Sequence, residues 1–131
     1  MAPPVVACHH RVVRTRRTVL IVDDHEAFRD AARALLEAAG FDVIGEVGDG
    51  IEALGAVAAF RPDIVLLDIQ LHGPDGFDVA ERLAESADAP AVVLISSRDA
   101  AAYGPRLAQT SARGFIPKSG LSGDALTALV G

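Results

Sequence analysis

The segment PDIVLLDIQ, residues 62–70, sets the interpretation of the whole chain. Residues 64–67 are a continuous apolar run, which is typical of a strand buried on both faces in a parallel sheet. Asp68 follows this run, at the end of the strand where open α/β sheets bind their ligands. Taken alone, Asp68 is more simply a turn or helix-capping residue than a reactive group. The rest of the sequence changes that balance.

The composition indicates one globular domain. A chain of 131 residues, 50% of them hydrophobic, is long enough for one core and short for two. Residues 1–17 hold four arginines and no acidic residue, which leaves eight basic against 18 acidic residues in 18–131. We therefore expect a flexible basic N-terminal tail at 1–17 and a domain at 18–131. The acidic domain argues against direct nucleic-acid binding.

The cysteine content and hydropathy favour a cytoplasmic protein. Cys8 is the single cysteine, so no internal disulfide can form, which fits a reducing compartment. Residues 5–8 (VVAC) resemble a lipoprotein cleavage box, but they lack the basic front and the long apolar segment of a signal peptide. No apolar run approaches the roughly 20 residues of a membrane span, so we expect no membrane partner.

Apolar runs and helical patterns alternate along the chain. The predicted strands are 18–22, 42–47, 64–67, 91–95 and 114–116, and the predicted helices are 26–39, 51–60, one from Gly76, 99–109 and 121–130. Gly104 and Pro105 should interrupt the fourth helix, because proline removes a backbone donor and clashes inside a helix. The alternation predicts a flavodoxin-like (βα)5 three-layer sandwich, with a five-stranded parallel sheet of order 2-1-3-4-5.

The helical spacing also predicts which side chains face the core. Phe41 and Phe77 are expected there. In the first helix the apolar face is predicted at Ala27, Phe28, Ala31, Ala34, Leu35 and Ala38, and in the second at Ile51, Leu54, Val57 and Ala58.

Polar residues follow four of the predicted strands. They are Asp23 and Asp24 after the first strand, Asp68 after the third, Ser96 and Ser97 after the fourth, and Lys118, the only lysine, after the fifth. In the predicted order the first and third strands are neighbours, so the three carboxylates should share one crevice. Two such charges ~4 Å apart repel by ~4 kcal/mol at an effective dielectric of ~20.

A divalent cation would offset this repulsion, and Mg²⁺ prefers oxygen ligands. Lys118 offers a second positive charge, and Ser96 offers a hydroxyl donor. These groups suit an aspartyl phosphate, with Asp68 as the nucleophile.

The chain resembles the receiver domain of two-component response regulators over residues 18–131. The motifs that carry the resemblance are VLIVDDH (19–25), DIVLLD (63–68), DG (75–76), LISS (94–97) and GFIPK (114–118). The resemblance implies that a sensor histidine kinase transfers a phosphoryl group to Asp68. It also implies a Mg²⁺ site formed by Asp24, Asp68 and the backbone carbonyl of Gln70, with Asp23 acting largely through water.

The same resemblance assigns the switch. Ser96 and Lys118 would contact the phosphoryl group, and Ser96 and Phe115 would form a coupled switch pair. Their rearrangement would reshape the surface of the fourth helix, fifth strand and last helix, which could also support a homodimer. The protein would then be either a stand-alone receiver or the regulator of a DNA-binding output domain beyond residue 131.

Some residues depart from the family pattern. His72 stands where the loop after Asp68 usually has a proline, so the path of that loop is left open. Gln70 and Arg98 occupy positions that tune phosphate lifetime in the family. Phe115 has no hydroxyl, and Gly104-Pro105 make the predicted signalling surface atypical.

The sequence leaves two alternative functions. A receiver-like module that works without phosphorylation remains open because of His72 and the broken fourth helix. A phosphatase of the haloacid-dehalogenase type also uses an aspartyl nucleophile, but it needs two aspartates separated by one residue, whereas Asp23 and Asp24 are adjacent. His25 is expected at the rim or the helix start rather than as a Mg²⁺ ligand.

Overall fold

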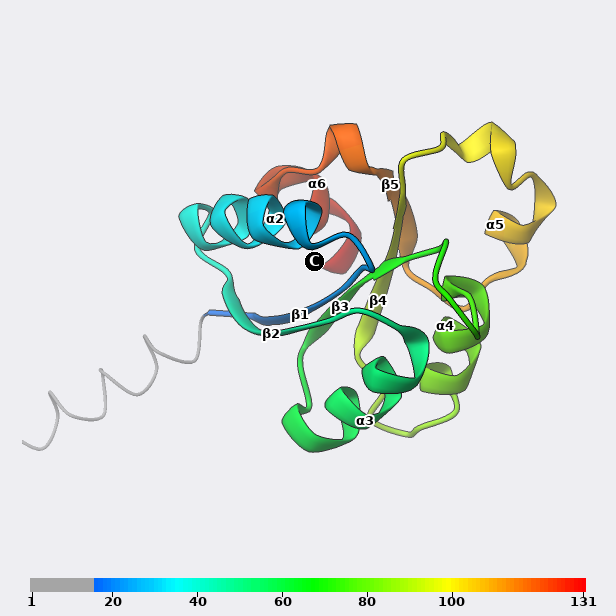
Figure 1. Ribbon diagram of the computed structural model, residues 1–131, viewed down its shortest axis with the longest axis horizontal. Helices are drawn as coiled ribbons and strands as arrows, with labels where there is room; N and C mark the ends of the chain where they lie inside the picture. Colours follow the sequence, from blue (N-terminus) through cyan, green and yellow to red (C-terminus); the bar gives the residue numbers. More distant parts are fainter. Residues whose placement is uncertain (1–15) are drawn as a thin grey trace, which may run out of the picture.

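The computed structural model describes residues 16–131, so Cys8 and most of the predicted tail lie outside the described residues. The five strands form one parallel sheet of order β2-β1-β3-β4-β5, which confirms the predicted topology (Figure 1). The strands are β1 (Thr18–Val22), β2 (Asp42–Val47), β3 (Ile64–Asp68), β4 (Ala91–Ser96) and β5 (Gly114–Pro117). The helices are α2 (Glu26–Ala38), α3 (Gly50–Phe60), α4 (Gly76–Ala84), α5 (Pro105–Gln109) and α6 (Gly123–Val130), with short 3₁₀ turns η1 (Ala100–Ala102) and η2 (Lys118–Gly120).

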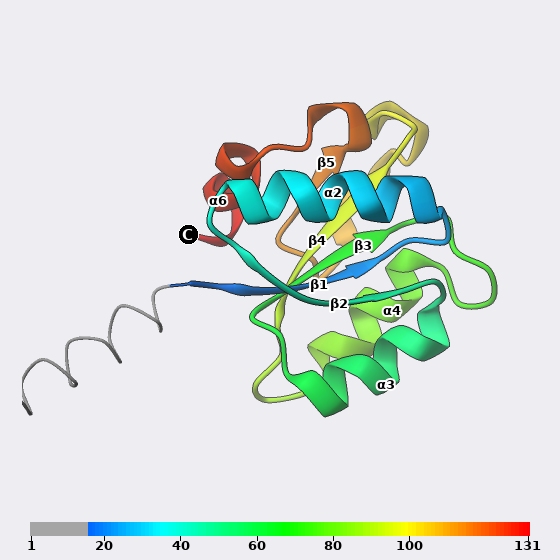
Figure 2. The ribbon, with the colours of Figure 1, turned by 60° about the vertical axis from the view of Figure 1, so that its left-hand side comes forward.

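Helices cover both faces of the sheet. Figure 2 shows α2 and α6 on one face and α3 and α4 on the other. Strand β1 contributes Val19 and Ile21 to the core on the α2 and α6 side, and Leu20 and Val22 to the core on the opposite side. Because alternate side chains enter two different cores, the central strands are apolar at every position rather than at every second one.

The predicted face of the first helix is wrong. In α2 the buried residues are Ala32 and Leu36, whereas Leu35 is 37% exposed and Ala31 is also exposed. The two faces lie about 100° apart around the helix, one residue along the sequence. The side toward the sheet also carries the partly buried Phe28, which packs against the core.

The predicted face of the second helix is only partly correct, since Leu54 and Val57 pack against the core but Ile51 and Ala58 are exposed. In α3 the small residues Gly50, Ala53 and Ala56 are buried. Ile51 is 65% exposed and Phe60 is 56% exposed. The small residues let the helix approach the sheet closely, and of the larger apolar side chains Ile51 and Phe60 are exposed.

The fourth predicted helix is interrupted as expected. It is divided into η1 and α5, with Gly104 between them at a φ of 53° and Pro105 as the first residue of α5. Neither piece contains a fully buried residue. This segment is therefore attached to the core by few side chains.

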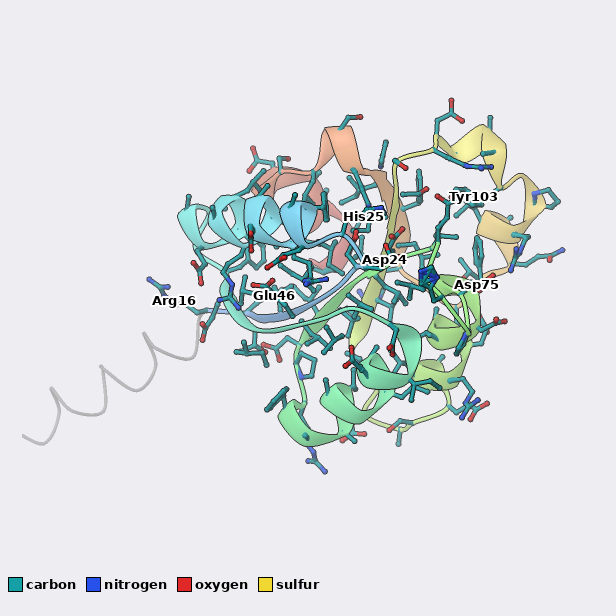
Figure 3. The ribbon with its side chains drawn as sticks, in the orientation of Figure 1. Arg16, Asp24, His25, Glu46, Asp75 and Tyr103 are labelled. Carbon is teal, nitrogen blue, oxygen red and sulfur yellow. The ribbon has the colours of Figure 1, made fainter. Side chains whose placement is uncertain are left out.

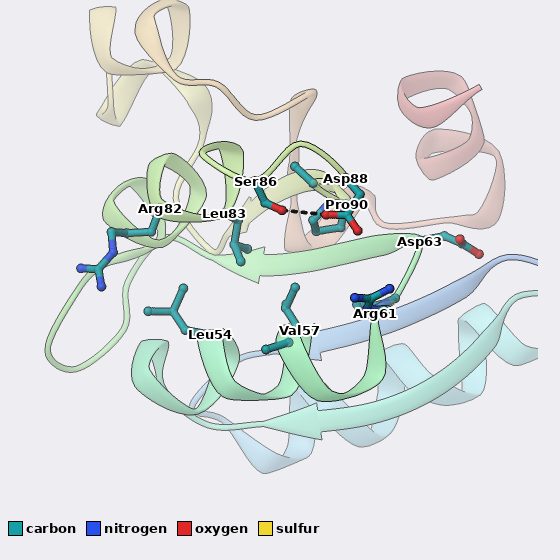
Figure 4. A pocket seen from close by; sticks show the side chains of 12 residues that line it. Leu54, Val57, Arg61, Asp63, Arg82, Leu83, Ser86, Asp88 and Pro90 are labelled. Atoms are coloured by element: carbon teal, nitrogen blue, oxygen red, sulfur yellow. Dashed lines mark hydrogen bonds between the residues drawn. The ribbon is translucent and has the colours of Figure 1, made fainter.

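A cavity of about 590 Å³ lies between α3 and α4, lined by apolar residues that include Leu54 and Val57 and by Arg61 (Figure 4). It also touches Asp63 and Pro90, which precede β3 and β4. The cavity is thus at the amino ends of the strands, away from the polar residues at their carboxyl ends. Within residues 16–131 no helix combines the length and apolarity needed to cross a membrane.

Candidate metal and phosphoryl site

The register of β1 and β3 brings their terminal aspartates together. Val22 of β1 is paired with Leu67 of β3, so Asp23 and Asp68 follow side by side at the carboxyl edge of the sheet. Asp23 is fully buried and Asp68 is 2% exposed. The apolar runs of β1 and β3 end at this edge of the sheet, and the polar side chains follow directly after them.

Three carboxylates and one imidazole converge at this edge. One ligand atom from each of Asp23, Asp24, His25 and Asp68 lies within 4.8 Å of the others. Figure 3 shows Asp24 and His25 together where β1 ends. The His25 Nδ1 atom lies 2.9 Å from Asp24 Oδ1 and 3.2 Å from Asp23 Oδ1. The sequence placed His25 at the rim, and its ring is indeed largely exposed, although it contacts both carboxylates.

Lys118 supplies the opposite charge. Its ammonium nitrogen lies 2.6 Å from Asp23 Oδ2 and 3.4 Å from Asp68 Oδ2. The same nitrogen lies 4.6 Å from the centre of the Phe28 ring, so α2 helps to hold it over the site. This role of Phe28 could not be predicted from the sequence, because an apolar residue at that spacing indicates only a helix face.

The oxygen donors fit a hard divalent cation. Among the described residues, Asp23 Oδ2 and Asp24 Oδ1 are inaccessible and have no hydrogen-bond partner. Their nearest polar groups are Lys118 Nζ, 2.6 Å from Asp23 Oδ2, and His25 Nδ1, 2.9 Å from Asp24 Oδ1, and neither contact has hydrogen-bond alignment. Buried carboxylate oxygens without an aligned donor suit a cation that prefers oxygen ligands.

Burial and the neighbouring Asp23 carboxylate raise the pKa of Asp68. Desolvation is the main cause and repulsion from Asp23 adds to it, so the pKa reaches about 6. Lys118 and the backbone amide of Gln70, which donates to Asp68 Oδ1 at 3.2 Å, act in the opposite direction. The carboxylate is therefore ionised at neutral pH, and an added positive charge nearby would favour that form.

The loop after β3 is fixed by a close backbone contact. The Gly76 amide donates to the carbonyl of Ile69 at 2.8 Å. A Cβ atom at Gly76 would lie 2.4 Å from the carbonyl oxygen of Asp68, so only glycine fits. His72 is 88% exposed and its Nε2 lies 3.8 Å from Asp24 Oδ2, which places this atypical loop residue at the rim of the site.

Ser96 has an aromatic partner that the sequence did not indicate. Its buried Oγ lies 2.5 Å from the hydroxyl of Tyr103 and accepts the Arg98 amide at 3.0 Å. The ring of Phe115, the predicted switch partner, instead packs edge-on against Tyr103, with centroids 6.0 Å apart. Tyr103 therefore lies between the two residues of the predicted pair.

The model of the response regulator receiver domain family matches residues 19–130. The chain belongs to the response regulator receiver family. It is thus a receiver domain of two-component signalling, as the motifs at 19–25, 63–68 and 114–118 predicted.

Individual relatives agree with the family. The chain is 40% identical over 100 residues to a Pseudomonas aeruginosa protein named as a transcriptional regulator, covering 76% of this receiver domain and 48% of the relative. It is 45% identical over 80 residues to a protein-glutamate methylesterase/protein-glutamine glutaminase of Myxococcus xanthus. The match covers 60% of this chain and 23% of that relative. Among solved structures, the signal receiver domain of the response regulator NarL from Mycobacterium tuberculosis superimposes with a TM-score of 0.77 at 33% identity, covering 88% of this chain and 98% of that one.

This receiver domain spans about half or less of the length of these curated relatives.

Proposed function

We propose that Asp68 of this receiver domain accepts a phosphoryl group from a phosphohistidine of a sensor kinase. The observation that carries the proposal is the position of its carboxylate, which lies beside two further aspartates and 3.4 Å from the Lys118 ammonium. A buried nucleophile with cationic support on one side and anionic metal ligands on the other suits phosphoryl transfer, in which positioning and charge stabilisation supply most of the catalysis.

In the proposed step, a carboxylate oxygen of Asp68 attacks phosphorus as the bond from phosphorus to the imidazole nitrogen breaks. The imidazole leaves with the electron pair and takes up a proton. Asp68 is ionised at neutral pH, since its pKa is about 6. Lys118 balances charge on the transferred group, and the Ser96 hydroxyl donates to one of its oxygens.

Asp23, Asp24, Asp68 and the backbone carbonyl of Gln70 would hold a Mg²⁺ ion. When bound, the ion neutralises charge that develops on the phosphoryl oxygens. Asp23 also contacts the Lys118 ammonium through its Oδ2 atom, so the same carboxylate would help to hold both the Mg²⁺ ion and Lys118.

The proposed output is a change of surface rather than a reaction on a substrate. Phosphate contacts at Ser96 and Lys118 would shift the balance between two packings of η1, α5, β5 and α6, and a partner would read the difference. One relative is named as a transcriptional regulator, which supports a transcriptional output. In the proposal the domain acts in the cytoplasm and controls a DNA-binding domain beyond residue 131, or forms a homodimer through this surface.

The test is incubation with acetyl phosphate and Mg²⁺, followed by intact-protein mass spectrometry. The wild-type protein should gain one phosphoryl group, and chelation of Mg²⁺ should abolish the gain. Asp68→Asn should not be modified. Asp63→Asn is the matched control, because Asp63 precedes the same strand at the opposite, exposed edge of the sheet, and this variant should be phosphorylated normally. Modification of Asp68→Asn at the wild-type level would refute the assignment.

A further inference from the structure

The hydroxyl of Ser96 is already engaged in the structure. Ser96 Oγ is fully buried, accepts the Arg98 amide at 3.0 Å and lies 2.5 Å from the Tyr103 hydroxyl. A serine hydroxyl has one donor hydrogen and two acceptor lone pairs. Arg98 uses one lone pair, and the single hydroxyl hydrogen can be donated to Tyr103 or to a phosphoryl oxygen, but not to both.

The Tyr103 ring connects three parts of the fold. It packs edge-on against Phe77 of α4 at 5.8 Å and against Phe115 of β5 at 6.0 Å between centroids. Tyr103 itself directly follows η1, and Figure 3 labels it on the side of the sheet near α5. A movement of its phenol would therefore change the packing of α4, β5 and the segment of η1 and α5.

The segment that carries Tyr103 is held to the core by few contacts. η1 and α5 contain no fully buried residue, and Tyr103 and Leu107 are the side chains of these two turns that pack against the core. Arg106 adds an exposed ion pair to Asp75 at 3.3 Å and lies over the Phe77 ring, 4.2 Å from its centroid; the exposed ion pair contributes little stability. Gly104, at a φ of 53°, provides a joint next to Tyr103. Loss of the Tyr103 anchor should therefore release this segment at low cost.

We propose that the phenol of Tyr103 and a phosphoryl group on Asp68 compete for the hydroxyl of Ser96. The inference rests on the proposed function. In the unphosphorylated state Tyr103 holds Ser96, and the hydrogen bond between the two hydroxyls keeps the 97–109 segment against the sheet. When Ser96 donates to a phosphoryl oxygen, that bond breaks and Tyr103 is released. Phe115 has no hydroxyl, so it packs against the responding ring without being the hydrogen-bonded partner.

The sequence supplies a specific probe of this event. The chain contains one tyrosine and no tryptophan, so its intrinsic fluorescence reports on Tyr103 alone. The experiment compares tyrosine emission in wild type, Ser96→Ala and Ser97→Ala, with and without Mg²⁺ and beryllofluoride as the phosphoryl analogue. Fluorine NMR records independently whether beryllofluoride is bound. Ser97 is the matched control, because it is the exposed neighbour of Ser96.

Ser96→Ala alone should change the emission of Tyr103, and Ser97→Ala should not. Beryllofluoride should move wild-type emission toward that of Ser96→Ala. Bound beryllofluoride with unchanged tyrosine emission would overturn the inference, as would identical emission from wild type and Ser96→Ala. Absence of a bound fluorine signal in the wild-type protein would instead contradict the proposed function on which the inference rests.

Tyr103→Phe tests the competition without relying on fluorescence. It removes the phenol hydroxyl while keeping the ring between Phe77 and Phe115. Removal of one competing hydrogen bond should tighten beryllofluoride binding by roughly fivefold. Unchanged or weaker binding by this variant would show that Tyr103 does not compete for Ser96.

Discussion

The buried carboxyl group of Asp68, the proposed nucleophile, lowers the stability of the fold when it is ionised. Its pKa of about 6 lies above the ordinary value of 3.8, because it is buried beside Asp23. The native state thus binds this proton more tightly than the unfolded chain does. Its contribution to stability is present while the acid is protonated and is lost as the pH rises from about 4 to about 6.

This shift makes the difference between Asp68→Asn and wild type depend on pH when no divalent cation is present. Near pH 4 the two proteins should have similar free energies of unfolding, because both carry a neutral side chain at 68. At pH 7 the variant should be more stable by up to about 3 kcal/mol, from a shift of about two pKa units. Urea denaturation in EDTA across this range measures the difference, and a difference independent of pH would contradict the assigned pKa.

At the level of single elements, the orientation of α2 can be tested by two adjacent leucines. Leu36 is fully buried, whereas Leu35 is 37% exposed. Leu36→Ala should lower the free energy of unfolding by about 2 to 5 kcal/mol, the usual range for a buried leucine. Leu35→Ala is the control and should cost well under half as much. A larger loss for Leu35→Ala than for Leu36→Ala would indicate that the helix presents the face predicted from sequence.

A second pair of variants tests the contact between the first residue of α4, Gly76, and the backbone at Asp68 and Ile69. Gly76→Ala would place a Cβ atom 2.4 Å from the Asp68 carbonyl oxygen, so the backbone that carries the nucleophile must shift. We expect lower stability and slower phosphorylation by acetyl phosphate. Gly55→Ala in α3 meets no atom within 4 Å and should be neutral or stabilise the protein by up to about 1 kcal/mol. Normal phosphorylation of Gly76→Ala would show that the loop tolerates the displacement.

The elements differ in how far the sequence determines them. Strands could be predicted because apolar runs such as 64–67 and 91–95 are unambiguous. The orientation of α2 could not, because its many alanines make several faces almost equally apolar. In α3 the residues that face the sheet are small, because the helix lies close to the sheet. A pattern of large apolar side chains does not identify such a face. The site followed from polar residues at strand ends, whereas the contact between Ser96 and Tyr103 depends on the path of a broken helix.

At the scale of the whole molecule, binding of Mg²⁺ should be coupled to folding. The carboxylates come from the ends of β1 and β3, which are distant in sequence, so the unfolded chain has no comparable site. At a concentration one hundred times the dissociation constant, Mg²⁺ should stabilise the wild-type protein by about 2.7 kcal/mol. Asp24→Asn should reduce this gain strongly.

Asp30→Asn provides the matched control, since Asp30 is exposed on α2 and lies outside the converging set of carboxylates. It should retain the full gain in thermal denaturation with and without Mg²⁺. An identical response from Asp24→Asn and Asp30→Asn would mean that the ion binds elsewhere.

The most direct test is chemical mapping of the modified residue. Protein treated with acetyl phosphate and Mg²⁺ is reduced with borohydride, which converts an aspartyl phosphate to homoserine, and its peptides are then sequenced by mass spectrometry. The arrangement of Asp68 between the metal ligands and Lys118 predicts homoserine at position 68 alone. Homoserine at another aspartate, with position 68 unchanged, would contradict it.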